Sequence, residues 1–452
     1  MFRYIPNTPE DQAKMLSVIG AESIGQLFAD IPGDLRLKRD LDLPCAMSEP
    51  ELLSHMRRMA SENVNTDTHV CFLGAGAYDH FVPSVVEHVI SRSEFYTSYT
   101  PYQPEISQGM LQAIFEYQTM ICRLTGMDVS NASMYDGATA LAEAALMAVR
   151  ATGRNRVLIS QGLHPEYRDV LKTYASFTGI EITEVPLSDG ALCMRELESK
   201  LSGTAEKFAA VVVQSPNFFG AIEDMSQAAE LSHKCGALFI ACVDPISLAI
   251  LQAPGEYGAD IAAGDGQPLG NPLNFGGPHF GFLAAKKELV RKMPGRIVGQ
   301  TTDHDGRRGF VLTLQAREQH IRREKAVSNI CSNQALNALA ATVYLSVMGK
   351  QGLKEAAELC LSKAHYAFNK LLATGKFEKV NEAPFFKEFA VRSLAEPVEA
   401  INKRLLDRGF IGGLELERFC PEMKNCWLLA VTEKRTKEEI DTLAEIAAGG
   451  DK

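Results

Sequence analysis

The chain is 452 residues long and 46% of them are hydrophobic, which is enough for a large core and for two or three domains. Its net charge of -10 at pH 7 leaves no basic surface, so nucleic acid and anionic membranes are not expected partners. No run of eighteen apolar residues occurs and the N-terminus has no apolar signal region, so neither a membrane span nor export is expected.

The first 65 or so residues are predicted to form a small helical arm. Thr8 and Pro9 start a helix that Gly20 ends, and a second, short helix follows. Glu51 lies three residues after Ser48, a spacing typical of a capping box, and starts a third helix. The pattern does not decide whether this arm packs on its own body or wraps a partner.

The stretch Tyr96 to Gly109 reads YTSYTPYQPEISQG and is unusual in its density of tyrosine. Pro101 and Pro104 keep it extended or turned until a helix begins near Ser107. The segment is too polar for a core strand and too aromatic for a flexible linker. A surface loop pinned by its tyrosines and a binding segment are both compatible with this composition.

From Val70 onward, short apolar runs alternate with helices. The run Gly74-Ala75-Gly76 resembles a dinucleotide-binding loop, but Asp79 stands in place of the third glycine and no helix-opening pattern precedes Pro83. We therefore do not predict a Rossmann nucleotide site here.

A glycine-led helix start follows at Asp136, Gly137 and Thr139. Glycine at this place lets backbone amides point outward with the positive end of the helix dipole behind them, which suits a phosphate group. A tight, close-packed helix start would use the same residues. The sequence leaves both readings open.

Strands and helices then alternate strictly, which predicts a parallel or mixed sheet covered on both faces. Ligands of such sheets gather at the strand C-termini, where His164, Asn217 and Asp244 lie. The predicted strands are 157–160, 181–186, 209–214, 237–243 and 279–284, with helices from 165, near 197 and over 224–235. Residues 258–278 and 306–334 are expected to be two long loops.

The C-terminal part is predicted to be a smaller α+β domain. Its expected elements are helices 353–373, 397–408 and 436–447 and strands near 377–381, 386–391 and 426–431. The predicted division is thus an arm over residues 1–65, a large α/β domain over 66–330 and a small domain over 331–452. The ten cysteines show no C-x-x-C pair or zinc spacing, so we expect reduced core thiols in a cytoplasmic protein and no metal site.

The helix start at Asp136, the histidine at 164 and the aspartate at 244 follow the order of a pyridoxal-phosphate site. Such a site needs amides for the phosphate, a flat group against the ring and a carboxylate for the pyridine nitrogen. It also needs a lysine, commonly some two dozen residues after the aspartate. Here Gln267 and Pro268 stand at that position instead.

Four stretches carry a resemblance to a known family. FLGAGAYDHFVP, YTSYTPYQPEISQG, NASMYDGATALAEA and REQHIRREKAVSNICSNQ resemble signatures of the N-terminal (alpha) subunits of bacterial two-subunit glycine decarboxylases, the P-proteins of the glycine cleavage system. The resemblance implies an aspartate-aminotransferase-like (fold type I) pyridoxal-phosphate transferase fold with an N-terminal helical arm and a small C-terminal α+β domain. It also implies that the cofactor lysine resides on a separate beta subunit.

The resemblance further implies a reaction. At the pyridoxal phosphate of the beta subunit, glycine loses its carboxylate as carbon dioxide, and the aminomethyl group passes to the lipoyl arm of the H-protein. The alpha subunit would then contribute walls to the partner's site, and we assign that role to Tyr96, Tyr99, Tyr102, Gln103, Glu105 and Gln108. Ser328 and Asn329 match the place where such enzymes lend a hydroxyl to the partner's phosphate, although a helix cap would use the same residue types. Asp136, Gly137, Thr139, His164 and Asp244 would form a vestigial cofactor pocket.

Two other functions remain open from the sequence. The chain could be an autonomous pyridoxal enzyme that uses Lys286, Lys287 or another lysine, although those two fit a solvated helix start better. It could also be a scaffold that stabilises the beta subunit without touching the substrate.

Overall fold

The computed structural model describes residues 4, 6–203, 207–326, 328, 330 and 333–450. It contains two compact units, Met1–Val64 and Asn65–Lys452. The division of the second unit into a large and a small domain stays a prediction. No described helix is both long and apolar enough to cross a lipid bilayer.

The described part of the first unit contains three short helices, as predicted. They are α1 (Pro9–Ile19), the 3-10 helix η1 (Ile24–Phe28) and α2 (Glu49–Ala60). Thr8 and Asp11 form a capping box at α1, Gly20 ends that helix at a φ of 73°, and Ser48 and Glu51 cap α2 in the same way. No side chain of these helices is buried.

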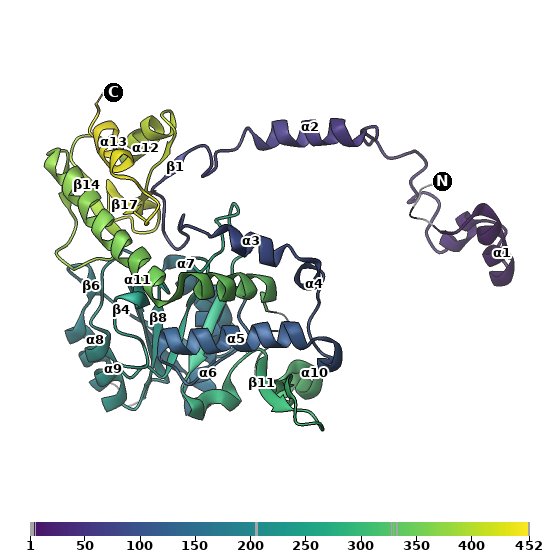
Figure 1. The fold of residues 1–452 in the computed structure, drawn as a ribbon, viewed down its shortest axis with the longest axis horizontal. Helices are drawn as coiled ribbons and strands as arrows, with labels where there is room; N and C mark the ends of the chain where they lie inside the picture. Colours follow the sequence, from purple (N-terminus) through teal and green to yellow (C-terminus); the bar gives the residue numbers. More distant parts are fainter. Residues whose placement is uncertain are drawn as a thin grey trace. The chain divides into compact units, whose positions relative to one another are not determined.

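A seven-stranded mixed sheet lies at the centre of the second unit (Figure 1). Its order is β2 (Val129–Ser130), β10 (Gly281–Ala285), β9 (Ile261–Asp265), β8 (Leu238–Val243), β7 (Ala210–Ser215), β3 (Arg156–Ser160) and β4 (Glu181–Val185). The β10 strand is antiparallel to both neighbours, and the other pairings are parallel. The predicted mixed sheet is confirmed.

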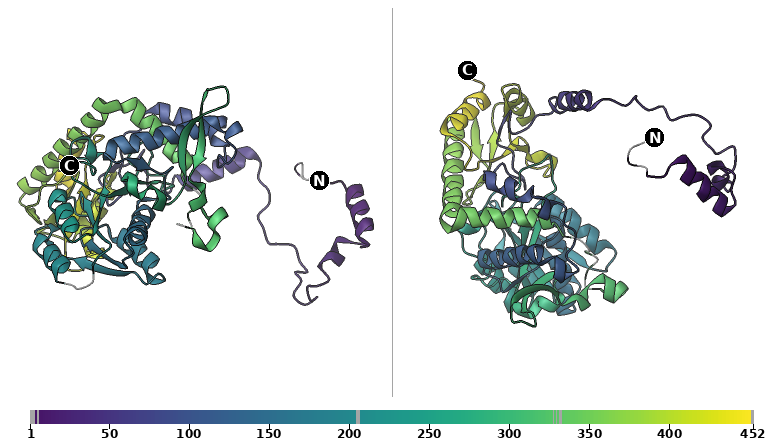
Figure 2. Two further views of the ribbon diagram at one scale, coloured as in Figure 1. Left: turned by 90° about the horizontal axis from the view of Figure 1, so that it is seen from below. Right: turned by 45° about the vertical axis from the view of Figure 1, so that its right-hand side comes forward.

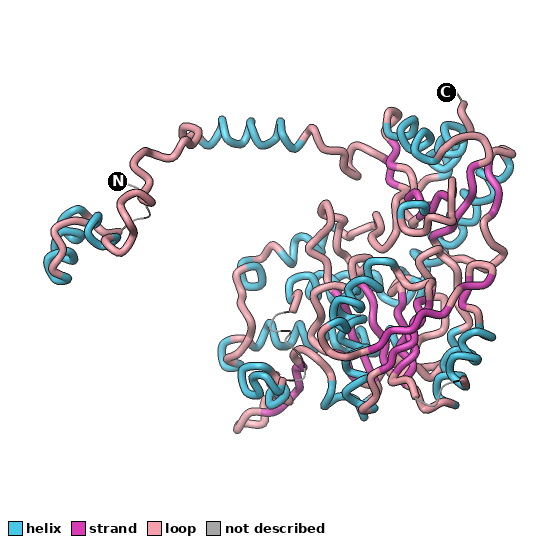
Figure 3. Tube along the Cα trace, turned by 180° about the vertical axis from the view of Figure 1, so that it is seen from behind, coloured by secondary structure: helices cyan, strands magenta, loops and turns pink. Residues whose placement is uncertain are grey.

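Helices cover both faces of this sheet (Figure 3). Helices α6 (Gly137–Thr152) and α7 (Pro165–Ser176) pack on one face, whereas α5 (Gln108–Thr125), α8 (Met194–Ser202), α9 (Met225–Lys234) and the start of α11 (Ala335–Ala373) pack on the other. Successive strand residues alternate between the two cores: Val157 and Ile159 face α6, and Leu158 faces the opposite side. Near-continuous apolar strands result from this two-sided burial.

The C-terminal elements gather at one end of the second unit (Figure 2). A four-stranded antiparallel sheet has the order β13 (Phe377–Lys379), β14 (Glu388–Ser393), β17 (Cys426–Ala430) and β16 (Leu414–Glu415), with helices α12 (Val398–Leu406) and α13 (Lys437–Ala447) packed on it. Helix α11 has a break at Gly349, where φ is 58° and ψ is -173°. Strand β1 (Val70–Cys71) pairs with β15 (Phe410–Ile411), so the chain after the arm starts beside this sheet.

Two predicted loops were wrong in part. Residues 258–278 contain β9, a central strand, which its small residues Ala262, Ala263 and Gly264 disguise because they lack the branched side chains typical of strands. Residues 306–334 contain β12 (Arg308–Thr313), which pairs with β11 (Ile297–Thr302), and helix α10 (Gln319–Arg322). The second loop is also expected to end at a helix that begins at about Ser332, and that residue lies outside the described residues.

The remaining described elements are short. They are α3 (Ser84–Ile90), α4 (Ser93–Tyr96), β5 (Leu187–Ser188), β6 (Ala191–Leu192) and the 3-10 turns η2 (Pro104–Ile106), η3 (Ser247–Ala249), η4 (Lys287–Lys292), η5 (Gln315–Arg317), η6 (Arg323–Lys325) and η7 (Leu416–Arg418).

Candidate functional site

A cavity lies at the C-terminal ends of β7, β8 and β9, and we call it the strand-end pocket. Its lining includes His164, Asp244 and Asp265 from the large sheet and its loops, and Lys387 and Glu388 from the start of β14. The fold therefore brings together His164 and Asp244, two of the residues predicted for a vestigial cofactor pocket. The cavity volume is only about 40 Å³.

The glycine-led helix start borders this pocket, and its first amide is already occupied. Asp136 caps α6 by accepting a hydrogen bond from the Thr139 amide at 2.8 Å. The Gly137 amide donates to Asp265 Oδ2 at 3.0 Å. A Cβ atom at residue 137 would lie 2.7 Å from the Asp265 amide nitrogen, which explains the glycine. The carboxylate of Asp265 thus takes the place at which an anion would meet the helix dipole.

Burial sets the charge of that carboxylate. Asp265 is partly buried at the pocket wall, and burial raises its pKa to about 6, partly offset by the amides of Gln267 and Gly137 that donate to it. Acceptance of two amide bonds keeps an ionised form available near neutral pH. A phosphate group at the same helix start would meet a like charge and would be repelled.

His164 is held by its own chain. It precedes α7, and its Nε2 atom lies 2.8 Å from the carbonyl oxygen of Ala75 while Nδ1 accepts from the Glu166 amide. Burial lowers the pKa of the imidazole, which agrees with a neutral ring that donates through Nε2. The rings of Tyr167 and Phe218 pack against it at 5.0 and 4.9 Å between centroids.

Asp244 forms an ion pair with a lysine of its own chain. Its Oδ2 atom lies 2.5 Å from Nζ of Lys387, and its Oδ1 atom accepts the amides of Ile246 and Ser247. The Lys387 ammonium also lies 3.6 Å from the ring centroid of Tyr78, a cation–π contact. The carboxylate assigned to a pyridine nitrogen is therefore neutralised by a lysine from β14's start.

The loop position expected for a cofactor lysine has a structural role instead. Gln267 is fully buried, and its side-chain amide donates to the carbonyl oxygens of Tyr78 and Asn271 while its Oε1 atom accepts the Tyr78 amide. The side chain therefore ties the loop after β9 to residue 78. Pro268 lines the pocket.

These residues do not fit a pyridoxal phosphate. Sites for ligands of that size have volumes of about 300–1,000 Å³, well above the cavity that remains here. Lys387 forms an ion pair with Asp244, and Asp265 accepts the first amide of α6. Glu388 accepts hydrogen bonds from the Ala75 amide and the Tyr78 hydroxyl, each at 2.6 Å. Room remains for ordered water.

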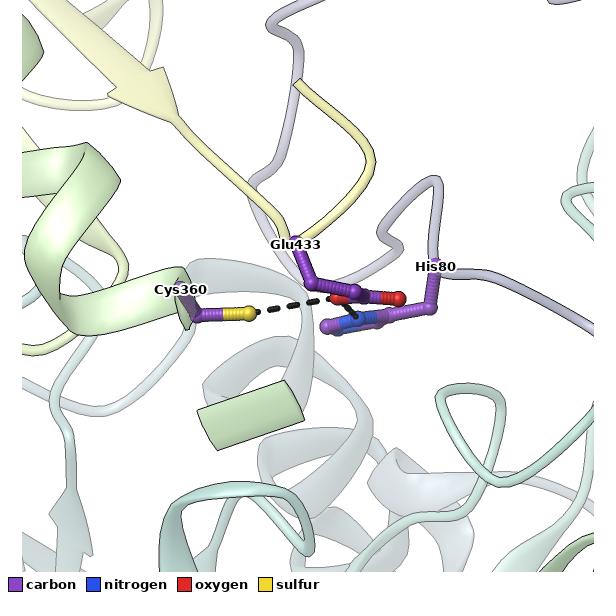
Figure 4. A group of neighbouring side chains, drawn as sticks. All are labelled: His80, Cys360 and Glu433. Carbon is purple, nitrogen blue, oxygen red and sulfur yellow. Dashed lines mark hydrogen bonds and ion pairs between the residues drawn. The ribbon is translucent and has the colours of Figure 1, made fainter. Parts of the chain in front are cut away.

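A second group of polar residues, made of His80, Cys360 and Glu433 (Figure 4), lies next to Lys387. The Lys387 ammonium donates to Nε2 of His80 at 3.0 Å, so the imidazole carries its proton on Nδ1 and donates it to Glu433 at 2.6 Å. Cys360, on α11, also donates to Glu433 at 3.2 Å. Burial alone would raise the pKa of Glu433, but the hydrogen bonds that it accepts from His80 and from the Phe81 amide hold its pKa below the usual value.

His80, Cys360 and Glu433 present three possible metal-ligand atoms within 4.8 Å of one another. The hydrogen bonds among them already satisfy these atoms, and the Lys387 ammonium would repel a metal cation at Nε2 of His80. Burial also raises the pKa of the Cys360 thiol, which opposes the thiolate that a metal requires. The cluster is a hydrogen-bond network that joins the large sheet's loops to the C-terminal sheet.

The segment Tyr96–Gly109, which we call the tyrosine segment, lies on the surface of the second unit. Tyr96, Tyr99 and Tyr102 expose 69, 82 and 49% of their area. Gln103 and Glu105 are also exposed. Aromatic side chains are costly to leave in water, so a row of this kind is typical of a contact surface.

Two interactions fix the tyrosine segment to the body. The Tyr102 hydroxyl accepts a hydrogen bond from Arg296 at 2.9 Å. Gln108 accepts the Phe310 amide at 2.8 Å and donates to the Phe310 carbonyl at 2.9 Å and to the Pro104 carbonyl at 2.7 Å. Both N–H groups of Gln108 are used within the chain, so it anchors the segment.

Ser328 also finds its partner within the chain. Its hydroxyl donates to Oε1 of the buried Glu143 on α6 at 2.7 Å. Asn329 lies outside the described residues. A contribution of this stretch to another subunit stays a prediction.

The pocket residues that the sequence did not reveal are Asp265, Lys387, Glu388 and Tyr78. Asp265 ends β9, which the sequence predicts to be a loop, so the sequence does not place this residue at a strand C-terminus. The pair Lys387-Glu388 interrupts the apolar run PFFKEFAV, and adjacent charges within a buried strand were the available signal.

The glycine cleavage system P-protein family model matches residues 2–447. A protein of Carboxydothermus hydrogenoformans, named a probable glycine dehydrogenase (decarboxylating) subunit 1, is 57% identical over 447 residues, with 99% of each chain covered. The corresponding protein of Anoxybacillus flavithermus is 55% identical, with 98% of each chain covered.

The fold matches solved structures. A crystal structure described as glycine decarboxylase (P-protein) of the glycine cleavage system, in inhibitor-bound form, has a TM-score of 0.89 and 48% identity and covers 99% of this chain and 100% of its own. Mouse CSAD in apo form has a TM-score of 0.67 at 16% identity over 99% of this chain and 93% of its own, which shows the fold alone.

Proposed function

The chain belongs to the glycine cleavage system P-protein family, and we propose that it is the subunit that shapes a partner's active site rather than one that holds a cofactor. Its fold is that of the fold type I pyridoxal-phosphate enzymes, and its function is that of glycine dehydrogenase (decarboxylating) subunit 1. The name subunit 1, which the relatives carry, implies a partner subunit.

The filled strand-end pocket carries this proposal. Lys387 neutralises Asp244, Asp265 occupies the α6 start and about 40 Å³ remain. A chain of this family without room for the cofactor acts on glycine through another chain's cofactor. We therefore assign pyridoxal phosphate and its lysine to the beta subunit, and we assign acceptance of the aminomethyl group to a lipoylated H-protein.

The tyrosine segment is the part of this chain that we assign to the shared site. Decarboxylation needs the carboxylate of glycine held in one orientation and water kept from the carbanion that forms, so the walls of the site matter. Tyr96, Tyr99, Gln103 and Glu105 offer two exposed rings with their hydroxyls, an amide and a carboxylate for this purpose. Tyr102 and Gln108 hold the segment in place, and Ser328 and Asn329 remain weaker candidates because Ser328 is bonded to Glu143.

Cofactor loading provides the first test. The purified chain is mixed with pyridoxal phosphate, reduced with borohydride and mapped by peptide mass spectrometry, and the complex with the beta subunit is treated identically. We expect a stoichiometric lysine adduct on the beta subunit and none on this chain. A stoichiometric adduct on Lys387, Lys286 or Lys287 would instead establish an autonomous pyridoxal enzyme.

Substitutions in the tyrosine segment provide the second test. In the assembled complex, Tyr99→Ala or Gln103→Ala is expected to lower the rate of glycine–bicarbonate exchange by about tenfold or more, because each removes a wall of the site. Phe177→Ala is the matched control, since Phe177 is an aromatic side chain with 94% exposure at the end of α7. Intact assembly with unchanged rates for both segment variants would favour a scaffold without contact to the substrate.

We also assign the complex to the cytoplasm. Every cysteine in the described part of the chain is a free thiol, and five of them are buried, as expected of a reducing compartment.

A further inference from the structure

A buried arginine lies against the tyrosine segment. Arg296 directly precedes β11 and exposes 5% of its area. Its Nη2 atom donates to the Tyr102 hydroxyl at 2.9 Å, and its guanidinium carbon lies 5.2 Å from the centroid of the Tyr102 ring. The same tyrosine is therefore fixed by a hydrogen bond and by a cation–π contact.

The charge of Arg296 is incompletely paired. The nearest carboxylate oxygen, Oε2 of Glu318, lies 3.9 Å from Nε of Arg296, beyond hydrogen-bond distance. Nε of Arg296 and Oε1 of Glu318 are both buried without a hydrogen-bond partner among the described residues. Nε of the buried Arg435 also lacks a hydrogen-bond partner among the described residues, so the contact with Tyr102 is what distinguishes Arg296.

The backbone that carries Arg296 is rigidly held. Arg317 donates to the carbonyl oxygens of Met293 and Gly295, the latter at 3.0 Å, and Asn131 donates to that of Pro294 at 3.1 Å. The guanidinium therefore contacts Tyr102 from a backbone segment whose position is fixed by these hydrogen bonds. With Gln108 bound to Phe310, the tyrosine segment is anchored at two points, Tyr102 and Gln108. Gln103 and Glu105 lie between these points in the sequence and Tyr99 lies just before them, and all three are exposed.

We propose that Arg296 is a positioning residue for glycine decarboxylation, acting through Tyr102 to hold the tyrosine segment in the geometry that the partner's site requires. Tyr102 covers the guanidinium, so Arg296 itself does not touch the substrate. This inference rests on the proposed function, which assigns the tyrosine segment to the shared site.

The test compares four variants in the assembled complex: Arg296→Met, Arg296→Lys, Tyr102→Phe and the double variant Arg296→Met/Tyr102→Phe. Glycine–bicarbonate exchange gives kcat and the KM for glycine, and gel filtration gives the assembled fraction. We expect Arg296→Met and Tyr102→Phe each to lower kcat/KM about tenfold. Arg296→Lys keeps a cation and a donor and should recover most of that loss, and the double variant should be no slower than the worse single variant.

Arg435→Met is the matched control. Arg435 is equally buried, at 5% exposure, and pairs with Asp79 at 3.0 Å. We expect this variant to lower the melting temperature while kcat and KM of the assembled complex stay unchanged. An equal kinetic loss in Arg435→Met would mean that generic destabilisation explains the effect and would overturn the proposal.

Two further outcomes separate this inference from the proposed function. Unchanged kcat/KM in Tyr102→Phe, which removes only one hydroxyl, together with a loss in Tyr99→Ala, would overturn the role of Arg296 and leave the proposed function standing. Multiplicative losses in the double variant would also overturn it, because Arg296 would then act by another route. Unchanged rates in Tyr99→Ala, Gln103→Ala and Tyr102→Phe would remove the proposed function of the segment itself.

Discussion

Lys387 replaces, with a side chain of the same protein, the positive charge that Asp244 would otherwise meet on a ligand. The two groups lie 2.5 Å apart, and the lysine side chain is 3% and the aspartate side chain 11% exposed. Each charge is tolerated in this position because the other is present.

Removal of the lysine should therefore be costly. Lys387→Met leaves Asp244 buried and unpaired, and we expect a loss of about 3–5 kcal/mol in the free energy of unfolding, measured by urea denaturation of the purified chain. The double variant Lys387→Met/Asp244→Asn should recover much of this loss, because no lone charge remains. Equal losses in the single and double variants would show that the pair is not coupled.

Glu388 gives the pocket a pH dependence. Burial raises the pKa of this carboxyl to about 7, from its ordinary value of 4.5. Between these values the folded chain keeps a proton that the unfolded chain releases, so the contribution of Glu388 is full below pH 4.5 and is lost as the pH rises through about 7. Glu388→Gln cannot titrate and should escape this loss.

The measurement is the urea midpoint of wild type and Glu388→Gln from pH 5 to pH 8. We expect the variant to gain stability relative to wild type as the pH rises, with a slope of at most about 1.4 kcal/mol per pH unit. The relative gain should level off above about pH 7. Parallel curves over the whole range would show that Glu388 titrates alike in both states.

At the level of single residues, the sequence predicted those whose neighbours are local. Asp136, Gly137 and Thr139 form a helix start within four positions, and His164 and Asp244 end up at the pocket because both lie where a strand ends. Lys387 could not be placed there, since its contact with Asp244 depends on how the C-terminal sheet docks.

The helices that the sequence predicts best are those with clear capping residues at their ends. The capping boxes of α1, α2 and α6 and the glycines that end α1, α5 and α6 fix those helices by local bonds. Strand β9 was missed because its alanines and glycine have low strand propensity, and burial between β8 and β10 makes it a strand.

Gln108 joins the start of α5 to β12, and its loss should loosen the β11–β12 hairpin. Gln108→Ala removes both bonds to the Phe310 backbone and exposes that backbone to water, for an expected loss of about 1–3 kcal/mol. Hydrogen exchange of the Phe310 amide should accelerate. Gln112→Ala is the control on the same helix, where Gln112 bonds only to Glu116, and it should leave Phe310 unchanged. Equal exchange in both variants would contradict the anchoring role.

At the scale of the whole molecule, the layer order and the alternation of strands and helices followed from two-sided burial and were readable from the apolar runs. The sequence does not show whether the pocket is open or filled, because the side chains that fill it come from segments far apart in the chain. The absence of a lysine at position 268 pointed to an altered site, and only the arrangement of Asp265, Lys387 and Glu388 shows how the space is used.

The arm, residues 1–64, presents a separate question of stability. Its α-helices have 11 and 12 residues and bury no side chain, and helices of that length are marginal in water. Leu52, Leu53, Met56 and Met59 of α2 are 48–53% exposed, and these apolar side chains would be stabilised by a covering surface.

Hydrogen exchange should reveal which surface covers them. We expect the amides of α1 and α2 to exchange within seconds in the isolated chain and to become protected by about tenfold or more in the complex with the beta subunit, because helix formation then gains the burial that the arm lacks. Helix α5, with seven buried residues, is the internal control and should be protected in both samples. Strong protection of α1 and α2 in the isolated chain would mean that the arm packs on its own body instead.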